Sequence, residues 1–460
     1  MKYKILISCL LLTLPKVSWG QTTLTLEEAE QLFLKNNLEL REQETERLVA
    51  ESAIQQAKLF NNPELSLEQL NLWSTQSQRE GEDTAIPPFI GSFGKNTQFA
   101  IALEQEVRLG GKRRKETRVA QLNHHLLSLK QANNREELLL HFRSLIFEKH
   151  YYDQYQQLLN EELNLLQQIS DAYQKQKELG FVSPSQLLRI QAATYEVEQE
   201  RLENQYSGSQ LNELIHSLMG ISLAHQLTVS LPSHSFELSS ELEQKLNTLF
   251  NTQTNKNGAS GLGLNQTPLR SSLANEAALD FSHHPLILIN QQEIELKKRS
   301  LALERSERIP NLTFSGSYDR RGGVWPNFIG FGIRFQLPVF NRNQGNIKAA
   351  RALLQFEQSK ITTHQLTLQN RVRTAWQTYV KLLDFRKELT QNLTYSNFEQ
   401  MQQNYVKNLL QKNISVLEFL DFTTAYKEGQ KIRLETEKEI QVHYFTLHYI
   451  LGNKTIHYEK

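Results

Sequence analysis

Sulfur and long apolar runs are both scarce in this 460-residue sequence. Its single cysteine, Cys9, lies in the apolar N-terminal segment, so the chain beyond it can form neither a disulfide nor a thiolate metal site. No later stretch approaches the ~20 consecutive apolar residues that a membrane-spanning helix requires. We therefore expect neither a disulfide-framed domain nor a helical membrane protein.

An excess of charge of one sign is also absent. Lys and Arg number 51 against 50 for Asp and Glu, and the formal net charge is +1. This balance gives no support for a nucleic-acid partner or for a polybasic membrane patch. Only 39% of the residues are hydrophobic, too few to fill a large globular core, so the helices are expected to bury narrow apolar stripes.

Signatures of catalysis are missing as well. No Ser/His/Asp or Cys/His arrangement, phosphate-binding loop or zinc-ligand spacing is present, so we expect no enzyme and no cofactor. The 13 histidines include the adjacent pairs His124-His125 and His283-His284. Neighbouring side chains on a helix point apart, which is poor ligand geometry, and no metal site is expected.

Residues 1–20 have the pattern of a secretory signal peptide. Lys2 and Lys4 precede the apolar run Ile5–Leu14, and small residues before Gln21 provide a cleavage site after Gly20. The sequence LISC ending at Cys9 is similar to a lipoprotein cleavage box, but too few apolar residues precede it. Cleavage after Gly20 is therefore favoured over lipidation.

The remaining chain repeats one order of elements. Pro63 opens the alternating stretch NPELSLEQL, and Pro310 opens IPNLTFSGSY. Ser183 in GFVSPSQLL corresponds to Ser415 in KNISVLEFL, an offset of 415 − 183 = 232. Each half predicts a helix, two strands, a very long helix and a long helix, a pattern that favours an elongated assembly.

These correspondences set the predicted boundaries. The first repeat is residues 21–232, with strands at 63–72 and 97–109 and a helical hairpin at 112–219. A partly mobile linker, 233–272, joins it to the second repeat. That repeat is residues 273–460, with strands at 310–319 and 328–340 and a hairpin at 345–452.

Strict alternation of apolar with polar or glycine residues marks the four strands. A half-buried strand of a soluble sheet has the same pattern, but the signal peptide and the scarcity of other strands favour transmembrane strands. The residues expected to face lipid are Phe99, Ile101, Leu103, Leu312, Phe314, Ile329, Phe331, Ile333 and Phe335. Gly330, Gly332, Arg334 and Gln336 are expected on the opposite, water-facing side.

The predicted long helices cannot stand alone. Residues 112–179 and 345–411 contain no proline, and at ~1.5 Å per residue each could extend on the order of 100 Å. Apolar residues recur every seven positions in the second, at Leu354, Ile361 and Leu368, as in a coiled coil. Partner helices must cover such a seam.

Four strands per chain cannot close a barrel that encloses water. An open sheet in lipid would leave its edge N–H and C=O groups unpaired, at several kcal/mol each. Three copies of the chain would supply twelve strands, an even number large enough to surround a lumen. We therefore predict a homotrimer.

Several motifs give this sequence a family resemblance. They are the opening LTLEEAEQLFLKNN, the strand starts NPEL and IPNL, and the G-x-x-S turn at Gly180–Ser183. With them, the chain resembles the outer-membrane efflux proteins of the TolC family over essentially its whole mature length. The stretches VRLGGKRRKETRVAQ and LPVFNRNQGNIKAA are most similar to the CzcC-type branch, which exports heavy-metal cations.

The resemblance implies a mixed, mainly α fold. A trimer would form a 12-stranded outer-membrane β-barrel that continues into a periplasmic α-helical coiled-coil barrel. Its partners would be a periplasmic adaptor (membrane fusion protein), an inner-membrane pump of the resistance-nodulation-division type and outer-membrane lipid of a Gram-negative bacterium. The same architecture would also suit a multidrug-efflux or type I secretion duct, and the helices alone would suit a soluble periplasmic adaptor.

The resemblance also places the hairpin tips at the periplasmic mouth, where an adaptor would dock. An ordinary helix end followed by a capped helix start explains the same residues without a partner. The tip residues are Gly180, Phe181, Val182, Ser183, Asn413, Ile414 and Ser415.

Glu418 and Asp421 match positions where the family places acidic residues around a closed aperture. They lie three residues apart on one helical face, and three copies would form a cation-attracting ring. Their first-repeat counterparts are Gln186 and Arg189, and Arg189 is a candidate to pair with one of the carboxylates. A solvated helical face with an incidental ion pair is the alternative.

Overall fold

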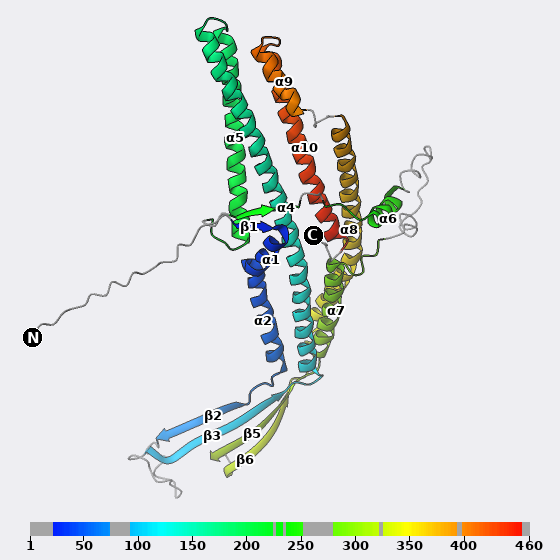
Figure 1. Ribbon diagram of the computed structural model, residues 1–460. Helices are drawn as coiled ribbons and strands as arrows, with labels where there is room; N and C mark the ends of the chain where they lie inside the picture. The colour runs from blue at the N-terminus through cyan, green and yellow to red at the C-terminus, as the bar shows by residue number, and fades with distance from the viewer. Residues whose placement is uncertain are drawn as a thin grey trace, which may run out of the picture. The chain divides into compact units, whose positions relative to one another are not determined.

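The computed structural model describes residues 22–73, 93–223, 227–232, 236–251, 279–321, 325–392 and 398–452. Figure 1 shows the elements along the chain. In order they are β1 (Thr22–Thr25), α1 (Leu26–Asn36), α2 (Leu38–Lys58), β2 (Glu64–Trp73), β3 (Phe93–Val107), α4 (Lys112–Glu178), α5 (Pro184–Leu218), β4 (Leu227–Ser230), α6 (Ser240–Asn251), α7 (Pro285–Ser306), β5 (Leu312–Arg321), β6 (Pro326–Phe335), α8 (Gln344–Asn392), α9 (Phe398–Leu410) and α10 (Val416–Ile450).

The chain divides into two compact units. We call residues 1–41, 134–280 and 368–460 the tip unit, and residues 42–133 and 281–367 the sheet unit. The helices α4 and α8 each contribute residues to both. No helix among the described residues is long and apolar enough to span a lipid bilayer.

The sheet unit contains one antiparallel four-stranded sheet in the order β2-β3-β5-β6 (Figure 1). Its register pairs Ile101 with Tyr318 and Tyr318 with Ile329, and directly opposed residues share a face. The nine residues predicted to face lipid therefore all lie on one face. Most are exposed in the single chain, and Phe331 is 90% exposed.

The opposite face of the sheet is polar and closely fitted. A Cβ at Gly332 would lie 2.6 Å from the Ser315 hydroxyl oxygen, and one at Gly330 would lie 3.0 Å from that of Ser317. Glycine at 332 therefore makes room for the serine opposite, and glycine at 330 makes room for both the serine opposite and the Phe328 ring, 2.9 Å from that Cβ position. Arg334 on the same face forms an ion pair with Glu104 at 2.9 Å. These residues share one face, as the alternation predicts.

Two strands end earlier than the sequence indicates. β3 stops at Val107 rather than at residue 109 because Gly110 and Gly111 take φ values of +70° and +68°, which turn the chain into α4. β6 stops at Phe335 rather than at residue 340. Pro338 has no N–H for a ladder, and the next amide, that of Val339, donates to the Leu337 carbonyl at 2.9 Å. Gln336 thus lies beyond the strand.

Three predicted segments differ in the structure. The single helix expected at the start of the first repeat is divided into α1 and α2 at Asn37, whose side chain accepts from the Leu40 amide and donates to the Leu218 carbonyl at 3.0 Å. The linker contains α6, whereas its Asn- and Gly-rich stretch lies outside the described residues. The long second-repeat helix is described as α8 and α9, and residues 393–397 between them lie outside the description.

The tip unit also contains a small sheet and an aromatic core. β1 and β4 form a parallel pair that their four-residue length hid from pattern analysis. Phe33 of α1 stacks on Phe142 of α4 with ring centroids 4.6 Å apart. Beside them Arg143 makes two hydrogen bonds to Glu30, at 2.6 and 2.9 Å, and this pairing compensates for the burial of both charges.

Candidate functional site

The first hairpin tip joins α4 to α5 through a left-handed turn at Gly180. Its φ is +78°, and the Gly180 and Phe181 amides donate back to the last carbonyls of α4 at 3.0 and 2.9 Å. Ser183 then caps α5 in a capping box with Gln186, and Pro184 follows at the first helical position. The sequence GFVSPS thus contains the signals that end one helix and start the next.

The second tip repeats this geometry with different residues. Lys412 takes a φ of +60°, and the Lys412 and Asn413 amides bond back into α9 at 3.0 and 2.8 Å. Ser415 caps α10, and the Glu418 carboxylate accepts a hydrogen bond from the Ser415 amide at 2.7 Å. Lysine therefore occupies a left-handed position that glycine fills in the first tip.

A lysine links the two tips of one chain. The Lys412 ammonium donates to the Phe181 carbonyl at 3.1 Å and lies 5.5 Å from the centre of the Phe181 ring. Phe181 itself is 65% exposed. The two tips therefore present one joined surface, and Phe181 and Leu179 are exposed apolar side chains beside its first turn.

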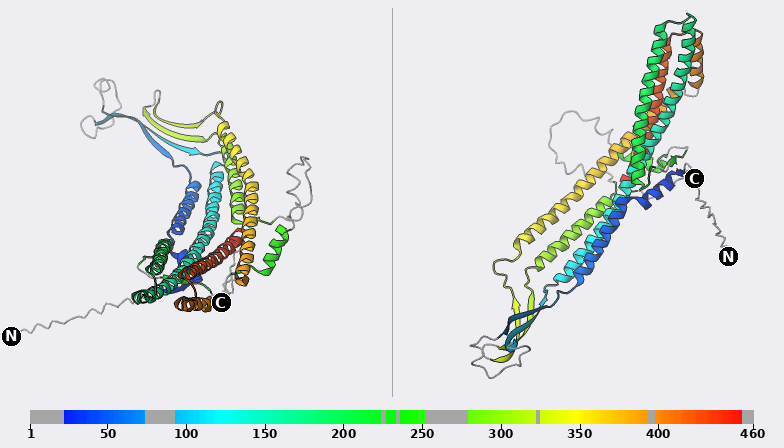
Figure 2. Two further views of the ribbon diagram at one scale, coloured as in Figure 1. Left: turned by 90° about the horizontal axis from the view of Figure 1, so that it is seen from above. Right: turned by 90° about the vertical axis from the view of Figure 1, so that its left-hand side faces the viewer.

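Below the tips, α4, α5, α9 and α10 pack around a shared apolar core, which we call the tip cluster; Figure 2 (right) shows the four helices together. Val182 and Ile414, two of the predicted docking residues, pack against it and do not project outward. The buried members are Tyr155, Leu159, Leu166, Ile169, Tyr173, Leu187, Ile190, Val197, Leu409, Val416 and Phe419.

The predicted gate residues are exposed, but two of them have local partners. The side chains of Glu418 and Gln186 are each used in a capping box. Hydrogen bonds from the Ser415 amide and hydroxyl lower the pKa of Glu418, so its carboxylate remains charged. Arg189 and Asp421 are also exposed, and among the described residues of one chain no ion pair joins Arg189 to either carboxylate. The expected pairing is therefore not made within a subunit.

A buried ionic cluster deeper in the tip unit was not predicted. Lys427 of α10 is 9% exposed and lies 2.7 Å from Glu200 of α5 and 4.0 Å from Glu162 of α4. The Tyr155 hydroxyl also donates to Glu200. No periodic signal marks these residues, because the burial of a charge depends on which helices meet.

The pKa values of the two carboxylates in this ionic cluster shift in opposite directions. It raises the pKa of Glu162 to about 7, and the nearby Lys427 charge only partly offsets the effect. Burial also opposes ionisation of Glu200, but hydrogen bonds from Lys427 and Tyr155 outweigh it and lower the Glu200 pKa. Glu200 is thus the charged partner of Lys427, and Glu162 titrates near neutrality.

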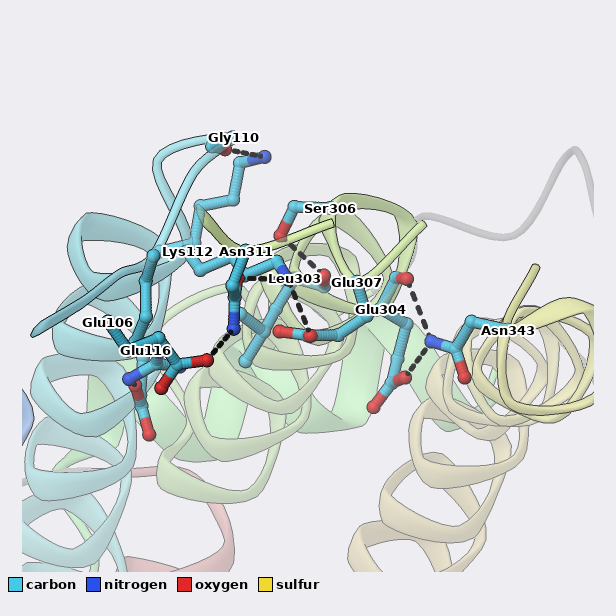
Figure 3. A network of polar contacts seen from close by, with 12 residues as sticks. Glu106, Gly110, Lys112, Glu116, Leu303, Glu304, Ser306, Glu307, Asn311 and Asn343 are labelled. Carbon is cyan, nitrogen blue, oxygen red and sulfur yellow. Dashed lines mark hydrogen bonds and ion pairs between the residues drawn. The ribbon is translucent and has the colours of Figure 1, made fainter. Parts of the chain in front are cut away.

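In the sheet unit, a polar network secures the passage from strand to helix (Figure 3). Lys112 is only 3% exposed and contacts Glu307 at 3.0 Å and Asn311 at 2.8 Å. Asn311 donates in turn to Glu106 at 2.7 Å. Lys112 opens the basic run Lys112–Lys115, and its charge is paired within the fold, away from solvent.

The predicted absence of a metal site is not contradicted in the described part of the chain, where no three His, Cys, Asp or Glu side chains gather closely enough to hold an ion. His284, from one of the adjacent pairs, caps α7 instead, and its Nδ1 accepts from the Leu286 amide at 3.2 Å.

The sequence is similar to a known protein family and to a known protein. Residues 30–220 match a family model described as outer membrane efflux protein. A stretch of 71 residues is 31% identical to the cobalt-zinc-cadmium resistance protein CzcC of Cupriavidus metallidurans. That match covers 15% of this chain and spans 17% of the length of the relative.

Solved structures share the fold at low identity. A structure of CusC, described in terms of folding and transmembrane channel formation, aligns with a TM-score of 0.64 and 16% identity over 93% of this chain and 92% of that one. The outer membrane channel CmeC of Campylobacter jejuni aligns with a TM-score of 0.68 and 13% identity, over 95% and 87% of the two chains.

Proposed function

We propose that this chain, which is similar to outer-membrane efflux proteins over residues 30–220 and shares the fold of solved outer-membrane channels, forms the exit duct of a tripartite efflux system. Three copies form the duct. A periplasmic adaptor joins it to an inner-membrane pump of the resistance-nodulation-division type, which supplies the energy. Divalent heavy-metal cations are its cargo. The duct itself catalyses no reaction.

The sheet is the observation that supports this proposal most strongly. β2 and β6 each pair with one neighbour in the described sheet, so each has a second edge that no described strand occupies. One face carries exposed apolar residues such as Phe331 and Ile333, and the other is polar. Joining the edges of three such sheets satisfies the backbone and turns the apolar faces toward lipid.

Purified protein tests the assembly directly. We expect a trimer in detergent that resists dissociation until heated, and water-filled channels when it is inserted into planar bilayers. A monomer that gives no conductance would contradict the proposal. Extraction from cell envelopes without detergent would support the rival function of a soluble periplasmic adaptor.

The proposed cargo depends on one short sequence similarity. The CzcC stretch favours metal cations over drugs or secreted proteins, and the fold suits all three. A deletion strain should become sensitive to cobalt, zinc or cadmium and retain its tolerance of dyes and detergents. The reverse pattern would assign the duct to multidrug efflux, and loss of a secreted protein would assign it to type I secretion.

We also propose that Glu418 and Asp421 form the acidic ring at the mouth. Both are exposed close to the tip, and the Glu418 charge is stabilised by the start of its own helix. The double variant Glu418→Gln, Asp421→Asn removes six charges from a trimer and preserves the cap, because Gln186 performs the same capping role in the first repeat. We expect higher conductance or weaker blockade by divalent cations. Unchanged currents would show that these two residues do not form a gate.

Phe181 is our principal candidate for adaptor contact. It is an exposed apolar residue at the first turn and the one that Lys412 of the second tip contacts, whereas Val182 and Ile414 are turned toward the tip cluster. Phe181→Ala should reduce copurification of the adaptor several-fold. Tyr195→Ala, an exposed aromatic along α5 away from the turn, is the matched control. Equal recovery with both variants would exclude Phe181 from the contact.

A further inference from the structure

A cationic pocket lies in the sheet unit where the second repeat passes from strand to helix. It is an open depression of about 700 Å³, formed by the segment just after α7, the loop after β6 and the start of α8. We call it the basic pocket. Its lining residues are Arg308, Phe340, Arg342, Gln344, Ile347, Lys348 and Arg351.

The charge of the basic pocket has one sign. Four of its seven lining residues are cations and none is acidic, and within the described residues none of the four forms an ion pair. The Arg342 Nε donates to the Pro338 carbonyl at 3.2 Å, and the rest of its guanidinium remains available. By contrast, Lys112 at the first strand-to-helix passage is paired with Glu307. Cations gathered in this way favour an anion with several acceptor oxygens.

The loop that frames the basic pocket is held in place. Asn343 takes a φ of +56°, and its side-chain amide donates to the Glu304 carbonyl at 2.9 Å and to the Glu304 carboxylate at 2.7 Å (Figure 3). This anchor fixes Arg342 between α7 and α8. The backbone that carries Arg342 is therefore held by the fold, and the four cationic side chains project from it into solvent.

Exposed apolar residues lead directly into the basic pocket. Ile333 and Phe335 end the apolar face of β6, and the chain continues through Leu337 and Val339, both exposed, to Phe340, which is 92% exposed. An inorganic anion would need only the cations. A molecule with an anionic head and an apolar tail would use both the cations and this apolar run.

We propose that the basic pocket binds the phosphate headgroup of an anionic phospholipid whose acyl chains lie against Leu337 and Phe340. The proposal rests on the membrane placement of the sheet given under the proposed function. The pocket then marks the level at which the apolar band ends and headgroups begin, and basic side chains at that level attract anionic lipid.

The test uses the full-length trimer in detergent, titrated with phosphatidylglycerol and examined by native mass spectrometry. Arg308→Gln with Arg351→Gln should lower the apparent lipid affinity by roughly 10-fold or more, as expected for loss of two basic side chains at a headgroup. Arg371→Gln with Lys381→Gln removes two exposed cations elsewhere on α8 and should change it less than about twofold.

Binding measurements with other ligands identify what the basic pocket recognises. Phosphatidylcholine, which has no net charge, should bind the wild type more weakly than phosphatidylglycerol, and inorganic phosphate should compete poorly. Equal lipid affinity in the two double variants, or full competition by free phosphate, would overturn the proposal. Faster dissociation of the pocket variant's trimer with unchanged lipid affinity would show that a second copy of the chain occupies the pocket, and would overturn it too.

The same samples separate this proposal from the duct itself. If the pocket variant conducts ions normally and lipid affinity never depends on the pocket, the duct stands and the lipid site is refuted. If the wild type is monomeric and gives no conductance, the membrane placement is wrong, and the lipid site is refuted together with it.

Discussion

The two hairpin tips have the same backbone but different side chains. Each ends a helix at a left-handed residue and starts the next with a capping box, at positions 232 residues apart (415 − 183 = 232). Gly180 and Lys412 occupy the left-handed positions, and Gln186 and Glu418 close the boxes. The two tips thus share their backbone geometry, and at these two positions only the second tip has charged side chains.

The comparison shows which features each repeat can vary. The left-handed turn and the serine cap recur because the backbone of an antiparallel hairpin needs them. The lysine is tolerated despite its positive φ, and its ammonium contacts Phe181 of the other tip. At the contact between the tips, the first therefore provides the Phe181 ring and carbonyl, and the second provides the Lys412 charge.

The largest loss of stability is expected from substitutions in the tip cluster, to which both repeats contribute buried residues at corresponding positions. Phe419 corresponds to Leu187 (419 − 187 = 232), and both are buried. Phe419→Ala should cost about 3–5 kcal/mol in the free energy of unfolding and Leu187→Ala about 2–5 kcal/mol, since each leaves a cavity. Thermal unfolding of the trimer and protease cleavage at the tips measure this. A cost below 1 kcal/mol for either variant would show that its hairpin packs independently.

A smaller change in the free energy of unfolding, about 1–3 kcal/mol, is expected from Glu162 in the ionic cluster between α4, α5 and α10. The folded-state pKa of Glu162 is raised from 4.5 to about 7, so the folded chain binds an extra proton between these values. The stability from this group is fully present below pH 4.5 and is lost as the pH rises through 7. Glu162→Gln should abolish that part of the pH dependence.

Unfolding midpoints of wild type and Glu162→Gln, measured at several pH values between 4 and 8, check this prediction. The control is Glu161→Gln, the exposed neighbour on the same helix, which should follow the wild type. Parallel curves for all three proteins would contradict the raised pKa of Glu162.

The capping serines should have effects of about 1 kcal/mol each. Ser183→Ala and Ser415→Ala remove the side-chain acceptor for an N3 amide at the start of α5 and α10, respectively. Amide hydrogen exchange should accelerate in the first turn of the affected helix alone. Spread of the change to the other hairpin would mean that the two tips form one cooperative unit.

The smallest effect is expected from exchange of the left-handed residues. Gly180→Lys should cost about 1 kcal/mol, because a side chain at a φ of +78° is strained even with open space around it. Lys412→Gly should change stability by less than about 1 kcal/mol, since relief of strain offsets the lost contact with Phe181. A larger loss in Lys412→Gly than in Gly180→Lys would show that the lysine contact, not the turn, organises the mouth.

Local patterns predicted much of this fold. Alternation placed Ile101, Leu312 and Ile333 on one face, and the helix signals around Gly180 and Ser183 placed the tip. These features depend on residues near one another in the chain. Strand ends were less predictable, because the pattern of alternation continued through Leu337 after the backbone had left the sheet.

The features that the sequence did not predict arise from contacts between distant segments. The burial of Lys427 depends on Glu200, which lies on another helix, and the pairing of Lys112 depends on Glu307. Neither contact can be predicted from a single sequence. The basic pocket was missed for the same reason, since Arg308 and Arg351 come together only after α7 and α8 pack.

The glycine–serine fit on the polar face would have a consequence for transport through the proposed duct. Where Gly330 and Gly332 lie opposite Ser317 and Ser315, this face presents hydroxyl groups and peptide backbone, with the Phe328 ring beside Gly330. Such a surface offers a passing hydrated ion shallow, nearly equivalent resting places that exchange readily with water. If the proposed duct forms, friction along this stretch would be low and nearly independent of ion identity, and chemical selection would fall to its proposed partners.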